Sequence, residues 1–408
     1  MKKSRKSLNQ VNRGSDVFVM EVLMGKERAV LVGVSTLKVA PAQAQEYLLE
    51  LQRLAETAGA EVVETFLQRV HAFNPATLVG GGKVEEVRLF TEKHEADMVI
   101  FDEDLTGSQV RNLEKLLPGI KVLDRTGLIL DIFAKHARTA ESRLMVETAQ
   151  MQYMMPRLTR AWAHLSRQVG TGGGTPGIGM RGPGEAQLEV DRRLVRKRIQ
   201  ELKAKLKKIE RDRTLQAKHR ENIFHVGIVG YTNAGKSSLT NRLTNAGVYV
   251  ENKLFATLDS TTRKMHLAEG QNIILSDTVG FIRKLPHHLV ETFKSTLGVA
   301  AHADCILEII DATATDYMEH IEVANNVLNE LLSTAVLRLR VFNKIDIASA
   351  ERKEELAAAF PEAIQVSALE SIGIEDIKTR LLAELALWRS HREQKVIEEQ
   401  EAAVSWEN

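Results

Sequence analysis

The chain has 408 residues, of which 44% are hydrophobic, and its formal net charge is +1. A chain of this length and composition can bury the cores of two or three domains, and its balanced charge excludes a protein that is basic along its whole length. Its only cysteine is Cys305, which excludes disulfides within the chain, and it has no run of 18 apolar residues, so we expect no membrane span.

Residues 1–26 are the first segment, and four of the first ten residues are lysine or arginine. No apolar stretch follows these basic residues, so the segment is not a secretory signal. We expect a basic, flexible N-terminal tail. The alternative is an arm that binds nucleic acid.

Residues 27–135 alternate between short apolar runs and helical patterns. Strands that alternate with helices predict an α/β domain with a parallel sheet. The runs predict strands at 29–34, 61–67, 98–101 and 121–123, and the patterns predict helices at 42–58, 83–95 and 108–117.

Two polar segments of this domain resemble functional motifs. Three glycines at 80–82 precede Lys83, but they lack the Gly-Lys-Ser/Thr ending of a phosphate-binding loop. We therefore expect a strand-to-helix turn there, and a second nucleotide site, for ATP, stays open. Acidic residues occupy 102–104, and we expect a solvated loop rather than a metal or acid–base site.

Residues 136–221 carry two apolar seams with spacings of three and four residues. Such seams predict two long helices that pair as an antiparallel hairpin, or coiled coil. Residues 170–184 between them include eight glycines. A glycine-rich segment is ordinarily a flexible linker, but between paired helices it becomes the tip of the hairpin. The seams are Met151, Met155, Leu158, Trp162 and Leu165, and Val195, Ile199, Leu202, Leu206 and Ile209.

The second helix of the hairpin is strongly basic. Residues 191–220 hold 13 lysines and arginines against four acidic residues. This charge is typical of a solvated helix face, and it also suits contact with a phosphate backbone. The candidates for such contact are Arg181, Arg192, Arg193, Arg196, Lys197 and Arg198.

Residues 222–387 begin with an apolar run at 223–229, which predicts a buried strand, and a helix follows from Ser238. The loop between them has the pattern G-x-x-x-x-G-K-S, in which glycines let backbone N–H groups surround a polyphosphate. Lys236 can reach the terminal phosphates and Ser237 can ligate Mg²⁺. We expect nucleotide contacts from Gly230, Tyr231, Thr232, Asn233, Ala234, Gly235, Lys236, Ser237 and Ser238.

Three further motifs follow in order, each at the end of a predicted strand. The first is Asp277, Thr278, Val279 and Gly280, in which Asp277 can hold Mg²⁺ through water and Gly280 can donate its N–H to a γ-phosphate. The second is Asn343, Lys344, Ile345 and Asp346, and the third is Ser367, Ala368 and Leu369. The Asp346 carboxylate suits the two donors of guanine, which adenine lacks, so the motifs predict GTP rather than ATP.

A segment that senses the γ-phosphate should lie between the loop and Asp277. The position fits Leu254, Phe255, Ala256, Thr257, Leu258 and Asp259. We choose Thr257 as the second protein ligand of Mg²⁺, formed only in the GTP state. Spacing alone does not separate it from Thr261 and Thr262.

Phe281 follows Gly280, at the position where many GTPases have a glutamine that orients the attacking water. Phenylalanine cannot do this, so we predict that Lys236, Thr257 and Gly280 support only slow intrinsic hydrolysis. A partner, another domain or a cation would then supply the missing group. Asn233 could hold K⁺ beside the phosphates, or it could simply stabilise the loop.

The motifs and their surroundings resemble the HflX family of GTPases. Residues 254–259 resemble the first switch of that family, and residues 281–289 with Phe293, Thr296 and Leu297 resemble its second switch, which therefore spans 281–297. Residues 74–77, 82–86, 124–133 and 181–189 match the upstream part of the family. The resemblance covers about residues 28 to 385. It implies an N-terminal α/β domain, a helical hairpin, and a GTPase domain with a mostly parallel six-stranded sheet flanked by helices.

The resemblance also implies a cytoplasmic GTPase, with Mg²⁺, that binds the large (50S) ribosomal subunit. Its hairpin would approach the peptidyl-transferase centre and the ribosome would stimulate hydrolysis, in ribosome splitting or rescue under stress or in subunit assembly. We expect a monomer. The alternatives are a GTPase that assists an RNA-modification enzyme, and a nonribosomal signalling GTPase that uses the hairpin to bind proteins. For the tail at 388–408 the sequence leaves a packed helix and disorder open.

Overall fold

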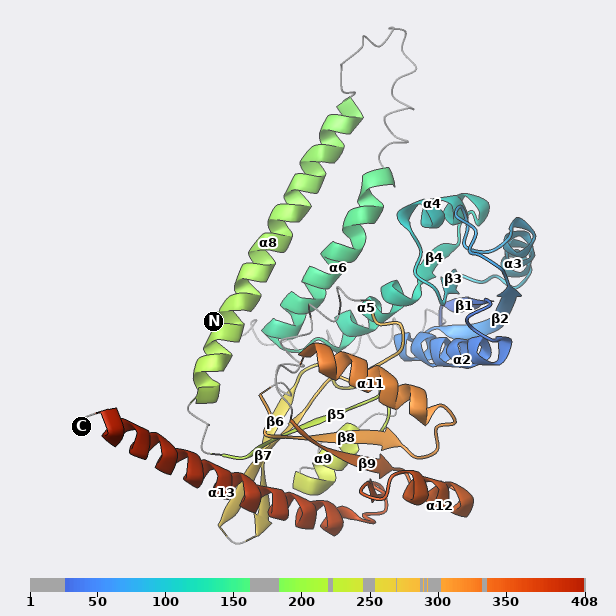
Figure 1. Ribbon diagram of the computed structural model, residues 1–408. Coiled ribbons are helices and arrows are strands. Elements are labelled where there is room, and N and C mark those ends of the chain that lie inside the picture. The colour runs from blue at the N-terminus through green and yellow to red at the C-terminus, as the bar shows by residue number, and fades with distance from the viewer. Residues whose placement is uncertain are drawn as a thin grey trace, which may run out of the picture. The chain divides into compact units, whose positions relative to one another are not determined.

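The computed structural model describes residues 26–161, 183–218, 223–244, 254–268, 270–286, 289, 292, 302–331 and 336–406 (Figure 1). It divides into two compact units, Met1–Ile129 and Leu130–Asn408. None of the described helices combines the length and the apolar character that a membrane crossing requires.

The first unit is built on a four-stranded sheet with the order β2-β1-β3-β4, in which all described pairs are parallel. Strands β1 and β3 are almost completely buried, as the strands of a parallel sheet are when helices cover it. The prediction of a parallel α/β domain is therefore confirmed. Its elements are β1 (Arg28–Ser35), α2 (Pro41–Ala58), β2 (Glu61–Arg69), α3 (Gly81–Lys93), β3 (Met98–Phe101), α4 (Gly107–Leu116) and β4 (Lys121–Asp124).

The turn between β2 and α3 contains the three glycines. Gly80 has an extended backbone directly before the first residue of α3, and its N–H donates to Gln68 Oε1 at 2.9 Å. The segment is thus a strand-to-helix turn, as predicted.

The acidic run at 102–104 differs from the prediction, because Asp102 is buried rather than solvated. Its Oδ1 accepts a 2.6 Å hydrogen bond from Arg125, whose guanidinium also pairs with Glu50. A buried carboxylate requires such a partner. This partner lies 23 residues further along the chain, at the start of α5 (Arg125–His136), where only the fold could reveal it.

The hairpin consists of α6 (Ala140–Ala161) and α8 (Pro183–Lys218), which run side by side in opposite directions (Figure 1). Ile199 and Leu202 are its buried seam residues in α8. Arg198 Nη2 donates to Glu147 Oε1 of α6 at 2.6 Å. The structure confirms the antiparallel helices, whereas Trp162, Leu165 and most of the glycine-rich tip lie outside the described residues.

A six-stranded sheet with the order β10-β9-β8-β5-β7-β6 carries the nucleotide motifs. The β6–β7 pair is antiparallel and the other described pairs are parallel, as predicted. Cys305 is buried at the start of β8, and burial raises the pKa of its thiol to about 12. The elements are β5 (His225–Gly230), α9 (Lys236–Thr244), β6 (Thr261–Ala268), β7 (Gln271–Asp277), β8 (Cys305–Asp311), α11 (Tyr317–Leu331), β9 (Leu337–Asn343), α12 (Ala350–Ala359), β10 (Ile364–Gln365) and α13 (Ile374–Trp406).

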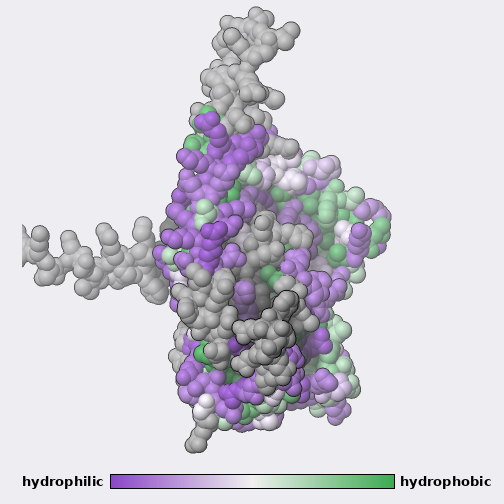
Figure 2. Space-filling model, turned by 60° about the vertical axis from the view of Figure 1, so that its left-hand side comes forward, coloured by the Kyte–Doolittle hydropathy of each residue, from purple (hydrophilic) through white to green (hydrophobic). Residues whose placement is uncertain are grey.

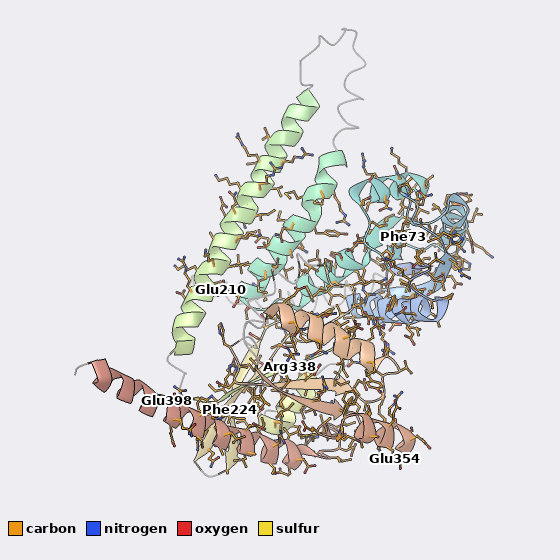
Figure 3. The ribbon with its side chains drawn as sticks, in the orientation of Figure 1. Phe73, Glu210, Phe224, Arg338, Glu354 and Glu398 are labelled. Carbon is orange, nitrogen blue, oxygen red and sulfur yellow. The ribbon has the colours of Figure 1, made fainter. Side chains whose placement is uncertain are left out.

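Helix α13 continues past residue 387, where the sequence analysis ended the GTPase domain. The Trp388 ring packs edge-on against Phe224, which Figure 3 labels beside α13. Trp388 Nε1 donates to Asp304 Oδ1 at 2.9 Å. Of the two possibilities left open for the tail, the structure has the helix, and it runs to Trp406.

Candidate nucleotide site

The four motifs meet at one edge of the six-stranded sheet, because β5, β7 and β9 are parallel and each motif follows a strand end. Ligands of α/β proteins bind at this kind of edge. Two glycines make the phosphate loop possible. A Cβ atom on Gly230 (φ +146°) would lie 2.1 Å from the Ile309 carbonyl oxygen, and one on Gly235 (φ +93°) would lie 2.1 Å from Asn343 Nδ2.

Lys236 is the buried cation of the site. Its Nζ donates a 2.8 Å hydrogen bond to the Tyr231 carbonyl of the same loop. Burial lowers the pKa of Lys236 to about 8, although the negative charge of Asp277 opposes this shift. The loop therefore holds an ammonium group that has lost most of its hydration and that a phosphate oxygen can pair with.

Three oxygen-bearing side chains converge beside the lysine. Ser237 Oγ lies 2.7 Å from Thr257 Oγ1 and donates to Asp277 Oδ2 at 2.6 Å. Asp277 Oδ1 is buried and has no hydrogen-bond partner among the described residues. Burial raises the pKa of Asp277, while Lys236 acts to lower it. Two hydroxyls and a carboxylate with an unused oxygen are the donor set that a hard cation such as Mg²⁺ prefers.

The structure separates the three threonines that the sequence could not. Thr261 and Thr262 belong to strand β6, and the Thr262 hydroxyl pairs with Ser276. Thr257 is the one of the three that meets Ser237. Its neighbours Phe255 and Leu258 bury their side chains in the protein, so only their backbone can face a nucleotide.

Asn343 joins the phosphate loop to the last motif. Its Nδ2 donates to the Ala234 carbonyl at 2.9 Å, and its Oδ1 accepts from the Ala368 N–H at 3.0 Å. Arg242 donates to the carbonyls of Ala368 and Leu369 at 3.1 and 2.8 Å. Asp346 follows in the same segment and is half-buried. The segments predicted to bind the base and the phosphates are therefore linked to one another by hydrogen bonds.

Phe281 is buried, and its backbone pairs with the phosphate loop. The Phe281 N–H donates to the Gly230 carbonyl at 3.0 Å, and the Thr232 N–H donates to the Phe281 carbonyl at 2.8 Å. The phenyl ring has no polar atom with which to orient water. The geometry thus agrees with the sequence in giving this position no chemical role.

The family comparisons agree with the arrangement of these motifs. The model described as "GTP-binding GTPase N-terminal" matches residues 45–134, the "GTP-binding GTPase Middle Region" model matches 136–220, and the "50S ribosome-binding GTPase" model matches 225–344. GTPase HflX of Caldanaerobacter subterraneus subsp. tengcongensis is 47% identical over 367 residues, which are 90% of this chain and 82% of that protein. The chain belongs to the HflX family of GTPases.

A further relative fits this assignment. GTPase HflX of Escherichia coli K12 is 45% identical over 74% of this chain and 70% of that protein. A crystal structure of a GTP-binding protein from Sulfolobus solfataricus in complex with GDP is similar over 89% of this chain and 99% of that chain, with 23% identity and a TM-score of 0.46. As a member of the HflX family the chain is a GTPase.

Two sets of contacts that the sequence did not predict join the switch segments to α6 or to the residues directly before it. Asp259 Oδ1 accepts a 2.6 Å hydrogen bond from the Thr139 hydroxyl, and its Oδ2 accepts from the N–H groups of Arg138 and Thr139 at 3.2 and 3.3 Å. Burial acts to raise the pKa of Asp259, but these hydrogen bonds and one from Ser142 outweigh it and lower the pKa. Thr292 Oγ1 donates to Gln152 Oε1 at 3.2 Å. A residue of each switch segment therefore touches the hairpin.

A third set of contacts surrounds Tyr231 of the phosphate loop. Its ring stacks on His320 of α11, with centroids 3.7 Å apart, and its hydroxyl accepts from the Arg283 N–H at 2.8 Å. The buried Arg283 guanidinium pairs with Asp316 and Glu319. The sequence offered no signal for these contacts, because Glu319 and His320 lie on α11 and Asp316 lies directly before it, outside every nucleotide motif.

The residues expected to contact a ribosome divide into three groups. Arg193, Arg196 and Lys197 are exposed on α8, where Figure 2 shows that the described part of the hairpin is mostly hydrophilic. Arg192 is half-buried, and Arg198 is bound to Glu147 within the hairpin. Arg181 lies outside the described residues.

Proposed function

We propose that this chain is a Mg²⁺-dependent GTPase whose nucleotide state controls its binding to the large ribosomal subunit. The observation that carries the proposal is a pair of contacts: Asp259 with Thr139, the residue directly before α6, and Thr292 with Gln152 of α6. A ligand shifts a conformational equilibrium only through contacts that differ between the two states. Because both switch segments contact one helix of the hairpin or the residue directly before it, a γ-phosphate that reorders the switches has a direct route to that helix.

The nucleotide would use the groups that converge at the sheet edge. Lys236 pairs with the terminal phosphates, and Gly280 donates its N–H to the γ-phosphate. Ser237 and Thr257 would hold Mg²⁺ directly, and Asp277 would hold it through water, which gives its unpartnered Oδ1 a hydrogen bond. Bound there, Mg²⁺ neutralises negative charge on the phosphates. The hydroxyls of Ser237 and Thr257 already lie 2.7 Å apart.

Guanine selection falls to the segment that follows β9. Asp346 accepts hydrogen bonds from the two donors of guanine, and the Ala368 backbone lies within the same motif cluster through Asn343. The proposed nucleotides are therefore GTP and GDP. The connection of Asn343 to Ala234 supports a single site in which base and phosphates are bound by adjoining loops.

Hydrolysis should be slow until a partner acts, because Phe281 is buried and apolar. We propose the ribosome as that partner. Asn233 is exposed in a left-handed conformation (φ +61°) at the open side of the loop, so its side chain is free to bind K⁺ beside the phosphates. Hydrolysis rates measured in KCl and in NaCl test whether K⁺ activates the enzyme. Equal rates in the two salts would rule out an activating K⁺.

The hairpin is the proposed ribosome-binding element. Its exposed basic residues on α8 suit the phosphate backbone of rRNA, near the peptidyl-transferase centre. The match of residues 225–344 to a model described as "50S ribosome-binding GTPase" supports this partner. We propose a monomer in the cytoplasm that splits or rescues ribosomes under stress, or that acts in subunit assembly.

Co-sedimentation with purified large subunits tests the proposal. The chain should sediment with the subunit when a nonhydrolysable GTP analogue is present, and it should dissociate from the subunit when GDP is present. A GTPase that assists an RNA-modification enzyme, or a nonribosomal signalling GTPase, would bind the subunit in neither state. That result would overturn the proposed function.

A further inference from the structure

Thr232 is the third residue of the phosphate loop, and its hydroxyl differs from two other threonine hydroxyls near the site in its hydrogen bonding. The side chain is buried, with 7% of the residue exposed, and Oγ1 has no hydrogen-bond partner among the described residues. Two nearby threonines contrast with it. The Thr240 hydroxyl donates to the Lys236 carbonyl at 2.9 Å, and the Thr278 hydroxyl donates to the Ile228 carbonyl at 2.8 Å.

An unpartnered buried hydroxyl is costly. The hydroxyl has lost its hydrogen bonds to water and has gained none from the protein. The local fold does not relieve this cost, because the Thr232 N–H is already bound to the Phe281 carbonyl and the hydroxyl has no such contact. A buried polar group without a partner calls for an explanation, and an absent ligand is one.

The surroundings of Thr232 indicate which ligand. A Cβ atom built on Gly280 would lie 2.8 Å from both Cα and Cγ2 of Thr232, and 2.9 Å from Lys236 Nζ. Thr232, Gly280 and Lys236 therefore converge on one point. Gly280 and Lys236 are the two groups that the proposed function directs at the γ-phosphate. The methyl carbon Cγ2 is the side-chain atom of Thr232 nearest this point, and the hydroxyl is bonded to the same Cβ atom. The Thr232 side chain is thus at the γ-phosphate side of the loop, where the side chain of Phe281 offers no polar atom.

We propose that Thr232 is a catalytic residue whose hydroxyl accepts a hydrogen bond from the attacking water and donates one to a γ-phosphate oxygen. The water oxygen bonds to the γ-phosphorus, and the bond from that phosphorus to the β-phosphate oxygen breaks with its electron pair leaving on GDP. The protons of the water remain with the released phosphate and its solvent, and Thr232 is unchanged. The inference rests on the proposed nucleotide site, and it assigns to Thr232 the water-positioning role that Phe281 cannot fill.

The variant Thr232→Val tests this role, because valine keeps the shape of threonine and has a methyl group in place of the hydroxyl. Under single-turnover conditions without ribosomes, we expect the hydrolysis rate to fall at least about tenfold, because one positioned polar group typically contributes about a hundredfold or more. Affinity for GDP and for a nonhydrolysable GTP analogue should stay within about threefold, because the contact forms mainly in the transition state. Thr232→Ser, which keeps the hydroxyl, should retain most of the rate.

Two controls separate this inference from its alternatives. Thr240→Val removes a hydroxyl that is bound within α9, and it should leave the hydrolysis rate unchanged. Thr232→Ala removes the hydroxyl together with the methyl group, so it places no extra methyl group in the loop. It must show the same loss of rate, and it decides the matter if the valine variant misfolds. A valine or alanine variant that hydrolyses GTP at the parental rate would overturn the inference, as would an equal loss of rate and analogue affinity. Lys236→Ala reports on the site itself, since full nucleotide affinity in that variant would refute the proposed nucleotide site instead.

Discussion

The carboxylate of Asp259 accepts a 2.6 Å hydrogen bond from the hydroxyl of Thr139, the residue directly before helix α6. Thr139 Oγ1 also accepts from the Ser142 N–H at 3.1 Å, as an N-cap residue does. The carboxylate lies where the positive end of the helix dipole favours negative charge. One short contact thus joins the first switch to the start of the hairpin.

Replacing Thr139 with valine removes this contact while keeping the shape of the side chain. We expect binding of the large subunit in the GTP-analogue state to weaken by about 0.5–2 kcal/mol, the usual value of a lost cap. Nucleotide affinity should not change, because Thr139 lies outside the site. Isothermal titration and subunit binding measure the two quantities. Thr139→Ser keeps the hydroxyl and should behave as the parent, and a valine variant with parental subunit binding would argue against coupling through this bond.

The buried Lys236 predicts a pH dependence of nucleotide binding. In the nucleotide-free protein its pKa is about 8, below the ordinary 10.5, so it loses its proton as the pH rises through 8. Polyphosphate favours the charged form, and binding must then take up a proton. The association constant for GDP should therefore fall above pH 8, by at most about tenfold per pH unit. Titrations between pH 7 and 9 measure this, and Lys236→Arg, which stays charged, should lack the dependence. If the GDP association constant of the parent falls no more steeply with pH than that of the arginine variant, the predicted role of Lys236 is wrong.

Gly280 tolerates no side chain in the observed arrangement. The Cβ atom of Gly280→Ala would lie 2.8 Å from the Thr232 backbone and 2.9 Å from Lys236 Nζ, and the backbone atom cannot move aside easily. The switch must then shift away from the phosphate loop, so we expect hydrolysis to fall at least about tenfold with the loss of one γ-phosphate donor. GDP affinity should change little, because GDP has no γ-phosphate. Parental hydrolysis by the alanine variant would show that Gly280 makes no contact in the reaction.

Asp346 carries the proposed preference for guanine. Asp346→Asn exchanges one carboxylate oxygen for an amide donor, which faces a donor of the base. We expect affinity for GTP to fall at least about tenfold, since a site with an unmatched polar group discriminates strongly. Affinity for xanthosine triphosphate, which has an acceptor in place of the amino group, should rise. Competition binding with the two nucleotides measures the change, and an unaltered preference for GTP over ATP would refute the base assignment.

The motifs that the sequence predicts to bind the nucleotide come together in the fold, because each of them is local. Each motif is a short string at a strand end, and the carboxyl ends of parallel strands meet at one sheet edge. The apolar seam of α8 is equally local, and Ile199 and Leu202 are buried as its spacing predicts. Patterns of this kind depend on neighbours within a few residues.

Contacts between distant segments escaped prediction. Thr139 and Asp259 are 120 residues apart, and Asp102 and Arg125 are 23 apart. Each pair forms only because the fold brings two elements together, and no spacing rule relates them. Asp102 is an example of a side chain whose environment its sequence neighbours do not predict. An acidic run in a loop ordinarily faces water, but this carboxylate is buried in an ion pair.

The most direct test of the account is the dissociation constant for purified large ribosomal subunits, measured with GDP and with a nonhydrolysable GTP analogue. If the switches control the hairpin through α6, binding should be at least about tenfold tighter with the analogue, which is a typical coupling of 1–3 kcal/mol. Equal affinity in the two nucleotide states, or no binding in either, would contradict the central claim.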